Sequence, residues 1–337
     1  MRRFAWIDAA TIDGASRLLA RDQGKARVIA GGQDLIGELK DRLIDPETLV
    51  NIKGVPGLDR IRFEADGTLR VGALVTLAAL AGDERVGREF PAVAQAAAAV
   101  GSVEIRNVGT VGGNLCQRPR CWYYRSPHHI CLKKGGDVCF TPMGESRYNA
   151  ILGGGPSFIV HPSDLAPALI ACDARVTVVG PDGQREMPLQ QFYVLPSVRL
   201  DHETILKPGD LVTEVTVPAS ASIPAGVRSA YVKFKEKESF DFALAAVAAA
   251  VTMKGSACVS ARLVLGAVAP VPWRAAAAEA ILAGGTIDET SVTRAADAAL
   301  KGAAPLGGNG YKVPLTHALI RRTLLDLAGV APDLTSS

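Results

Sequence analysis

Two glycine-rich segments constrain this chain more than any other feature. The first follows an apolar run and reads Val28-Ile29-Ala30-Gly31-Gly32-Gln33-Asp34-Leu35. The second runs from Gly101 to Asn114 and includes Gly109, Thr110, Gly112 and Gly113. Glycine has no Cβ, so backbone N–H groups in such segments can approach a phosphate closely. With the hydroxyl and amide groups beside them, the two segments have the inventory to wrap a pyrophosphate and a ribose.

Each segment also has a simpler interpretation. A Gly-Gly pair after a strand is more often only a turn, and the second segment could be an irregular glycine loop. Neither segment has the G-x-G-x-x-G spacing that is typical of the Rossmann fold, which disfavours a site for NAD. Two such segments in one chain are much less common than one, and this favours the dinucleotide site.

The rest of the chain alternates helix and strand signals in three pieces, which predicts an α+β fold. The first piece covers residues 1–56 and the second residues 57–219. The stretch Pro218 to Gly226 is rich in Ala, Ser and Pro and is predicted to be a linker. The third piece covers residues 227–331.

Composition excludes several classes of partner. Lys and Arg total 37 against 34 Asp and Glu, and this small excess gives no footprint for nucleic acid. The strongly apolar stretch from Ala243 to Met253 is too short to span a bilayer. Residues 1–10 contain two arginines but no apolar core or cleavage site, so no signal peptide is predicted and the expected compartment is the cytoplasm.

Four of the six cysteines are concentrated in one stretch. Cys116, Cys121, Cys131 and Cys139 have the spacing C-x4-C-x9-C-x7-C. Disulfides are disfavoured in a cytoplasmic chain, and the gaps of nine and seven fit a structural zinc site poorly. A [4Fe–4S] cluster tolerates irregular spacing, and basic residues among the cysteines would favour thiolates. On chemistry alone, iron–sulfur and zinc both stay open.

Three motifs carry a family resemblance. They are AGGQDL (Ala30 to Leu35), R-N-x-G-T-V-G-G-N (Arg106 to Asn114) and HPSDLAPAL (His161 to Leu169). In this order they closely resemble the FAD-binding medium subunit of the xanthine dehydrogenase and carbon monoxide dehydrogenase group of molybdenum hydroxylases. The resemblance implies a two-subdomain FAD-binding domain followed by a smaller α+β C-terminal domain.

The resemblance also implies which residues bind FAD. Val28 to Leu35 would hold the pyrophosphate and adenosine side, and Asp164 would contact ribose or ribityl hydroxyls. Leu206 and Lys233 would lie near the isoalloxazine ring, although Lys233 and Lys235 could simply form the solvated face of a strand. The second glycine segment would supply Gly101, Arg106, Asn107, Gly109, Thr110, Gly112, Gly113 and Asn114.

Some members of this family, those resembling 4-hydroxybenzoyl-CoA reductase and the periplasmic aldehyde oxidoreductases, carry an extra [4Fe–4S] cluster in an insertion here. The run from Arg118 to Tyr124 is similar to theirs. In some relatives the fourth cysteine lies near the position of Pro156 or Ser157, where this chain has none. Cys116 is therefore expected to be the fourth ligand, beside Cys121, Cys131 and Cys139.

The function implied is electron transfer in a heterotrimer. A molybdopterin-binding large subunit would transform the substrate, and a [2Fe–2S] small subunit would connect it to the FAD of this chain. An external acceptor would complete the path. Two alternatives are a free-standing flavin oxidoreductase that acts directly on a substrate and a zinc-stabilised scaffold subunit.

Overall fold

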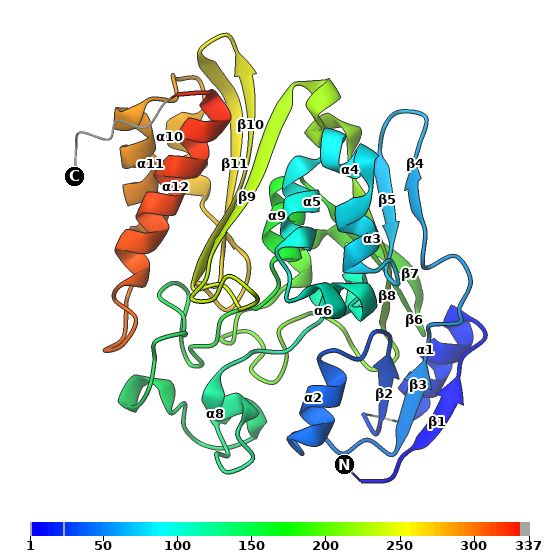
Figure 1. Ribbon diagram of the computed structural model, residues 1–337. Coiled ribbons are helices and arrows are strands. Elements are labelled where there is room, and N and C mark those ends of the chain that lie inside the picture. Colours follow the sequence, from blue (N-terminus) through cyan, green and yellow to red (C-terminus); the bar gives the residue numbers. More distant parts are fainter. Residues whose placement is uncertain (1, 23, 331–337) are drawn as a thin grey trace.

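The computed structural model describes residues 2–22 and 24–330, so the predicted domain ends at 1 and 331 lie outside the described residues. The chain begins with a parallel three-stranded sheet of order β1-β3-β2, flanked by two helices (Figure 1). Thr11 caps the first helix by accepting a hydrogen bond from the Gly14 amide. These elements are β1 (Ala5–Asp8), α1 (Ile12–Arg21), β2 (Ala26–Ile29), α2 (Leu35–Lys40) and β3 (Thr48–Asn51).

The second part contains an antiparallel five-stranded sheet of order β4-β5-β8-β6-β7. Its strands are β4 (Ile61–Phe63), β5 (Leu69–Gly72), β6 (Arg175–Gly180), β7 (Gly183–Pro188) and β8 (Leu211–Val217). Its main helices are α3 (Leu77–Gly82), α4 (Glu84–Glu89), α5 (Pro91–Ala98) and α9 (Leu165–Ala171).

The C-terminal part is an antiparallel four-stranded sheet of order β12-β11-β10-β9 with three helices on its outer face (Figure 1). Two 3-10 turns, Ala219–Ala221 and Ile223–Ala225, lie in the predicted linker before it. The strands are β9 (Val227–Phe234), β10 (Ala245–Lys254), β11 (Ala257–Gly266) and β12 (Trp273–Arg274). The helices are α10 (Ala276–Leu282), α11 (Glu289–Leu300) and α12 (Lys312–Ala328).

Strand β10 joins the two halves of the molecule because both of its faces are buried. Ala246 and Ala248 pack into the core formed with α5 and α9, whereas Val247 and Val251 pack into the core under α10 to α12. Alternate side chains of a strand point to opposite faces, so a strand between two cores is apolar throughout. This explains the long apolar run near Ala243 to Met253, and the α+β class predicted from the sequence is confirmed.

The second glycine segment is more regular than a glycine loop. It forms two short helices, α6 (Val103–Val108) and α7 (Val111–Leu115), which meet at Gly109 and Thr110. Ser102 and Thr110 cap them by accepting hydrogen bonds from the amides of Ile105 and Gly113. The hydroxyl groups of Ser102 and Thr110 thus serve as helix caps, and they fix the backbone conformation of the glycine-rich segment.

The cysteine segment follows α7 and has little regular structure. It contains α8 (Trp122–Arg125) and the 3-10 turns Leu132–Lys134 and Thr141–Met143. Within the described residues, no helix is both long enough and apolar enough to cross a membrane.

Candidate functional site

A cavity of about 510 Å³ lies where the first and second parts of the chain meet. This volume is in the range of small-molecule and cofactor sites. Both glycine segments line it, together with Pro162 and aromatic residues of the β9–β10 connection. The predicted cofactor residues that line it are Val28 to Leu35, Gly101, Gly109, Thr110, Gly112, Gly113, Asn114, Asp164, Leu206 and Lys233.

The two glycine segments touch each other at Gly31. A Cβ at this position would lie 2.1 Å from the Val108 carbonyl oxygen and 3.1 Å from the Gly109 Cα. Real side chains do not tolerate such distances, so Gly31 allows the backbones of the two segments to come together. Its neighbour Gly32 has a φ of 73°, which glycine adopts without strain.

Gly112 and Gly113 face different surroundings although they are adjacent in α7. A Cβ on Gly112 would lie 2.9 Å from the Ala73 Cβ, inside the protein. A Cβ on the exposed Gly113 would meet only the Thr110 hydroxyl, at 3.0 Å. Gly112 therefore serves packing at the end of β5, whereas Gly113 leaves backbone open on the cavity side.

A buried ion pair joins two other predicted residues. The Lys233 ammonium donates to Asp164 Oδ2 at 2.8 Å and to the Ala99 carbonyl at 3.0 Å, and the Tyr231 hydroxyl donates to Asp164 Oδ1 at 2.6 Å. Burial raises the pKa of Asp164, and the nearby Lys233 opposes that rise. The side chain of Lys233 is only 4% exposed, so the alternative that it belongs to a solvated strand face is wrong.

Two residues of the predicted set do not line the cavity. Arg106 donates to the carbonyls of Val100 and Gly101 at 3.0 and 3.2 Å and so fixes the turn before α6. Asn107 is exposed on the same helix. Because α6 is helical, these two positions turn away from the face that Gly109 presents to the cavity.

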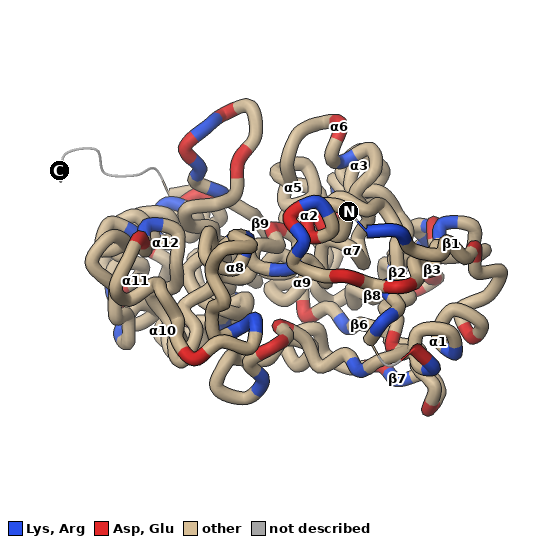
Figure 2. Tube along the Cα trace, turned by 90° about the horizontal axis from the view of Figure 1, so that it is seen from below, with Lys and Arg blue, Asp and Glu red and all other residues tan. Residues whose placement is uncertain are grey.

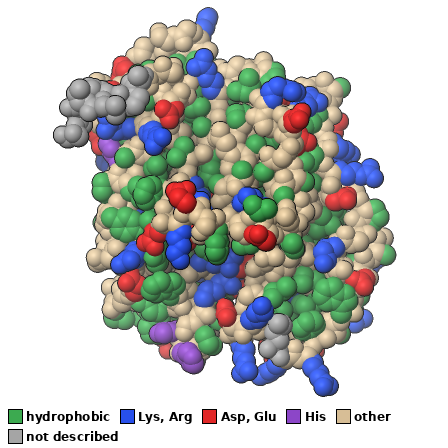
Figure 3. Space-filling model, viewed as in Figure 1, with side chains coloured by type: hydrophobic (Ala, Val, Ile, Leu, Met, Phe, Trp, Pro, Cys, Tyr) green, Lys and Arg blue, Asp and Glu red, His purple; other side chains and the backbone are tan. Residues whose placement is uncertain are grey.

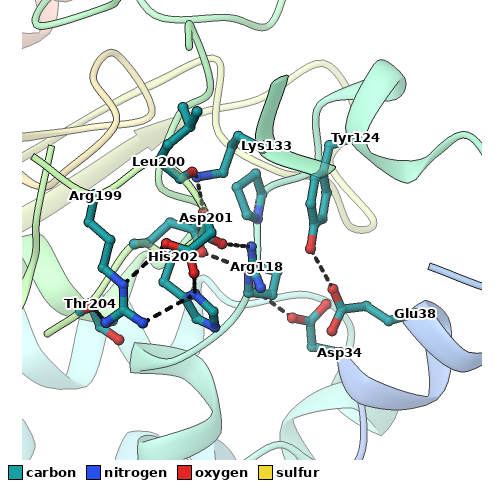
Figure 4. A network of polar contacts seen from close by, with 12 residues as sticks. Asp34, Glu38, Arg118, Tyr124, Lys133, Arg199, Leu200, Asp201, His202 and Thr204 are labelled. Atoms are coloured by element: carbon teal, nitrogen blue, oxygen red, sulfur yellow. Dashed lines mark hydrogen bonds and ion pairs between the residues drawn. The ribbon is translucent and has the colours of Figure 1, made fainter. Parts of the chain in front are cut away.

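Asp34, in the first glycine segment, connects the cavity wall to the cysteine segment. Its carboxylate accepts from the Arg118 amide at 2.6 Å and pairs with Arg120 at 2.8 Å and Arg125 at 2.6 Å. Figure 4 shows Asp34 and Arg118 meeting in this way. Sequence reasoning assigned Asp34 to the cofactor, but in this structure its carboxylate oxygens bind the cysteine segment of the same chain.

Further contacts join the cysteine segment to other segments of the chain, and Figure 4 shows one of them, between Tyr124 and Glu38. The Tyr124 hydroxyl donates to Glu38 Oε1 at 2.8 Å. The Glu203 carboxylate pairs with Lys133 at 2.7 Å and with Arg118 at 2.7 Å, and the side chains of Lys133 and Glu203 are 2% and 3% exposed. Sequence reasoning missed Glu203 because no motif precedes or follows it.

The basic residues of the cysteine segment therefore lie among acidic partners. Figure 2 shows positions of both signs side by side around α2, and Figure 3 shows Asp and Glu scattered among Lys and Arg on the face it presents. Four of them direct their charge at the carboxylates of Asp34 and Glu203, namely Arg118, Arg120, Arg125 and Lys133, whereas Lys134 donates to the Ser126 carbonyl.

The four predicted metal ligands do not come together. Cys121, Cys131 and Cys139 line a second, small cavity, which also contains Ser157 and Thr141. Cys116 instead lines the large cavity, where burial raises the pKa of its thiol to about 12. Cys116 immediately follows α7, and this helix directs it into the core beside the glycine segment. The prediction that Cys116 completes the set is not supported.

The thiols of the small cavity lie close to basic groups. Burial raises the pKa of Cys131, while hydrogen bonds from the backbone of Lys133 and Lys134 and the charge of Lys134 act in the opposite direction. In residues 2–22 and 24–330, no three His, Cys, Asp or Glu side chains are arranged to hold one metal ion. The structure thus gives no support to a [4Fe–4S] cluster on the predicted four cysteines.

Comparison with known families decides what the large cavity belongs to. The family model described as the FAD binding domain in molybdopterin dehydrogenase matches residues 2–220. This chain belongs to that family. A second model, the CO dehydrogenase flavoprotein C-terminal domain, matches residues 229–327. The predicted family and the expectation of FAD binding are therefore confirmed, and the large cavity is the candidate FAD site.

Individual relatives agree with this assignment. The chain is 39% identical over 263 residues to the aldehyde oxidoreductase FAD-binding subunit PaoB of Escherichia coli K12, which covers 77% of this chain and 80% of the relative. It is 28% identical over 319 residues to the carbon monoxide dehydrogenase medium chain of Afipia carboxidovorans, covering 93% of each chain. Among solved structures, a chain of the reconstituted CO dehydrogenase from Oligotropha carboxidovorans superposes with a TM-score of 0.77 at 27% identity, covering 98% of this chain and 99% of that chain.

Proposed function

We propose that this chain is the electron-transferring FAD subunit of a heterotrimeric molybdenum hydroxylase. In this proposal a molybdopterin-binding large subunit transforms the organic substrate, and the [2Fe–2S] centres of a small subunit exchange electrons with this chain. The chain in turn exchanges them with an external acceptor. The observation that carries the proposal is the cavity of about 510 Å³ lined by both glycine segments and by the buried Asp164–Lys233 pair.

The residues of the cavity fit FAD in two respects. Gly113 exposes backbone where any larger residue would fill the space, which suits an approaching pyrophosphate. Lys233 is held in place by two acceptors, so its ammonium would offset negative charge on a nearby ring without having to reorganise. When bound, FAD supplies the one- and two-electron chemistry, and the protein supplies position and electrostatics.

We keep the individual FAD contacts and the division into residues 1–56, 57–219 and 227–331 as proposals. The relatives are named as a FAD-binding subunit and as medium chains, which supports a role within a complex. The proposed function does not include an iron–sulfur cluster on Cys116, Cys121, Cys131 and Cys139.

The FAD site is tested at Gly113. Gly113→Val should place two methyl groups in the space that the pyrophosphate needs, and the FAD-to-protein ratio after gel filtration should fall to roughly a tenth of the wild-type ratio or below. Gly112 is unsuitable because its replacement would also disturb Ala73. The matched control is Gly87→Val, at an exposed position of a short helix with nothing within 4 Å of the new Cβ. Equal FAD content in both variants would refute the assignment.

The role in a complex is tested by purification from the native host. We expect the tagged chain to copurify with molybdenum and with two partner chains, one larger and one smaller than itself. The isolated chain should reduce its FAD poorly with any organic substrate. Robust substrate turnover by the isolated chain would instead establish a free-standing flavin oxidoreductase.

A further inference from the structure

We propose that Tyr231 is a positioning residue that sets the reduction potential of the flavin through the Asp164–Lys233 pair. The inference rests on the proposed function, in which FAD fills the large cavity and its ring lies near Lys233. Asp164 and Lys233 both line that cavity, whereas Tyr231 belongs to the buried core beside α5. None of the three sequence motifs includes Tyr231, because the residue reaches the site only through another side chain.

Strand β9 brings Tyr231 and Lys233 to one face, since side chains two residues apart in a strand point the same way. This strand packs against α5 (Figure 1). The Tyr231 amide donates to Gln95 Oε1 at 2.8 Å, and the Lys233 ammonium donates to the Ala99 carbonyl at 3.0 Å. Gln95 lies within α5 and Ala99 is its C-terminal cap, where the helix dipole favours a cation. One helix therefore fixes both residues of the strand.

Asp164 accepts hydrogen bonds from both residues at once. The Tyr231 hydroxyl donates to Oδ1 at 2.6 Å, and the Lys233 ammonium donates to Oδ2 at 2.8 Å. All three side chains are buried. Hydrogen bonds to a charged group are stronger than those between neutral groups, and a buried site strengthens them further. The charge of one carboxylate is therefore shared between a cation and a phenol.

The Tyr231 hydroxyl serves as the donor in this contact. Burial and the charge of Asp164 raise the pKa of Tyr231 well above its ordinary value, so the hydroxyl keeps its proton. Burial also raises the pKa of Asp164, and Lys233 and then Tyr231 oppose that rise. The phenol thus stabilises the carboxylate without adding a net charge to the site.

The sharing of this charge decides how strongly the Lys233 ammonium acts on the cavity. Negative charge that develops on a ring in the cavity is stabilised by an ammonium and destabilised by a carboxylate. The Tyr231 hydroxyl offsets part of the Asp164 charge, so the pair presents a more positive potential to the ring. Without the hydroxyl, Asp164 would offset more of the Lys233 charge, and the reduced flavin would be less stable.

A role in packing alone predicts a different result, and Tyr193 provides the matched control for it. Tyr193 is 7% exposed and Tyr231 is 6% exposed. The Tyr193 hydroxyl donates to the neutral Leu115 carbonyl at 3.3 Å instead of to Asp164. Tyr193→Phe therefore removes a buried hydroxyl of the same kind without changing the contacts of the ion pair.

The experiment measures the reduction potential of FAD bound to the full chain, titrated anaerobically against an indicator dye of known potential. At the potential where the wild type is half reduced, the ratio of reduced to oxidised FAD in Tyr231→Phe should fall about threefold to tenfold. A hydrogen bond to a charged group contributes a factor of about ten or more, and part of it acts on the ring. A tenfold change equals about 30 mV for a two-electron couple. Tyr193→Phe should keep the wild-type ratio.

A double-mutant cycle tests the route through Asp164. Asp164→Asn removes the negative charge and should raise the ratio of reduced to oxidised FAD. Adding Tyr231→Phe to that variant should then change the ratio little, because the charge on which the hydroxyl acts is gone. If Asp164→Asn holds no FAD, the comparison of Tyr231→Phe with Tyr193→Phe decides alone.

FAD content after gel filtration separates this inference from the proposed function. A wild-type chain without FAD would refute the proposed function itself. Tyr231→Phe with bound FAD and the wild-type potential would overturn only the inference. Equal shifts in Tyr231→Phe and Tyr193→Phe, a full effect of Tyr231→Phe in the Asp164→Asn chain, or loss of FAD from Tyr231→Phe would overturn it as well.

Discussion

The two cavities of this chain are built in opposite ways. Glycines such as Gly31 and Gly113 form part of the wall of the large cavity. Its shape therefore depends on how closely two backbone segments approach each other. The small cavity is bounded by side chains, and the stretch around it is held by buried ion pairs such as Lys133–Glu203. An added methyl group should therefore disturb the large cavity, and the removal of a buried charge should destabilise the segment around the small cavity.

The difference also explains how the two sites depend on each other. Glu203 pairs with Lys133 of the small cavity and with Arg118 of the large one. The segment from Ser157 to Asp164 lines the small cavity at its beginning and the large cavity at its end. A change at one site should therefore affect the other through these two connections, which add to the contacts of Asp34 with Arg118 and of Tyr124 with Glu38.

The largest effect should follow from removing the charge that both cavities share. Glu203→Gln leaves the Lys133 ammonium buried without a carboxylate, which should cost about 3–5 kcal/mol of unfolding free energy. Denaturant unfolding monitored by fluorescence measures it. The matched control is Glu186→Gln, which breaks the exposed pair with Arg175 and should cost under about 1 kcal/mol. If both variants lose the same amount, the side-chain network does not hold the small cavity.

A second, smaller effect concerns His161, which lies on the segment joining the cavities. Its ring packs 4.6 Å from that of Tyr193, and burial lowers its pKa from 6.5 to about 4. Between these values the unfolded chain binds a proton and the folded chain does not, so stability falls as the pH falls through this window. At 1.36 kcal/mol per unit the loss is about 3 kcal/mol, complete below about pH 4.

The measurement compares pH profiles of stability rather than absolute values, since replacing the ring also alters packing. Between pH 6.5 and pH 4, His161→Asn should lose less stability than the wild type by about that amount. His128→Asn, at an exposed position, should follow the wild-type profile. A His161→Asn profile parallel to that of the wild type would show that this imidazole does not resist protonation in the fold.

The same contrast shows what the sequence could and could not predict. Glycine signals are local, so the first segment was identified from Val28 to Leu35, and every one of these residues lines the cavity. Arg106 and Asn107 belong to the same motif as Gly109, but the helical turn of α6 points them elsewhere. A motif therefore predicted the region, and the local backbone decided which of its members face the cavity.

The small cavity was harder to predict from the sequence because it is assembled from residues that lie far apart along the chain. Spacing along the chain made Cys116 equivalent to the other three cysteines, but only Cys121, Cys131 and Cys139 line the small cavity. Strand β1 was missed for a related reason. Its four residues are mostly exposed, so they lack the apolar alternation that predicts a strand, and pairing with β3 alone defines it.

The third prediction tests the backbone contact that defines the large cavity. Gly31→Ala adds one methyl group 2.1 Å from the Val108 carbonyl, so the two glycine segments must separate. Overpacking of this kind costs about 1–3 kcal/mol of unfolding free energy. Because both segments line the FAD site, the same change should also lower the FAD-to-protein ratio, unlike Glu186→Gln. Both quantities are read from one set of samples by denaturant unfolding and flavin absorbance.

The matched control for this change is Gly37→Ala, six residues further along in α2. A Cβ there meets only the end of the Arg125 side chain, at 3.9 Å, and alanine in place of a glycine inside a helix is favourable by roughly 0.5–1 kcal/mol. One methyl group should therefore destabilise at position 31 and stabilise at position 37. If Gly31→Ala kept full stability and full FAD content, the contact between the glycine segments would not shape the cavity, and the contrast between a site built from backbone and one built from charged side chains would fail.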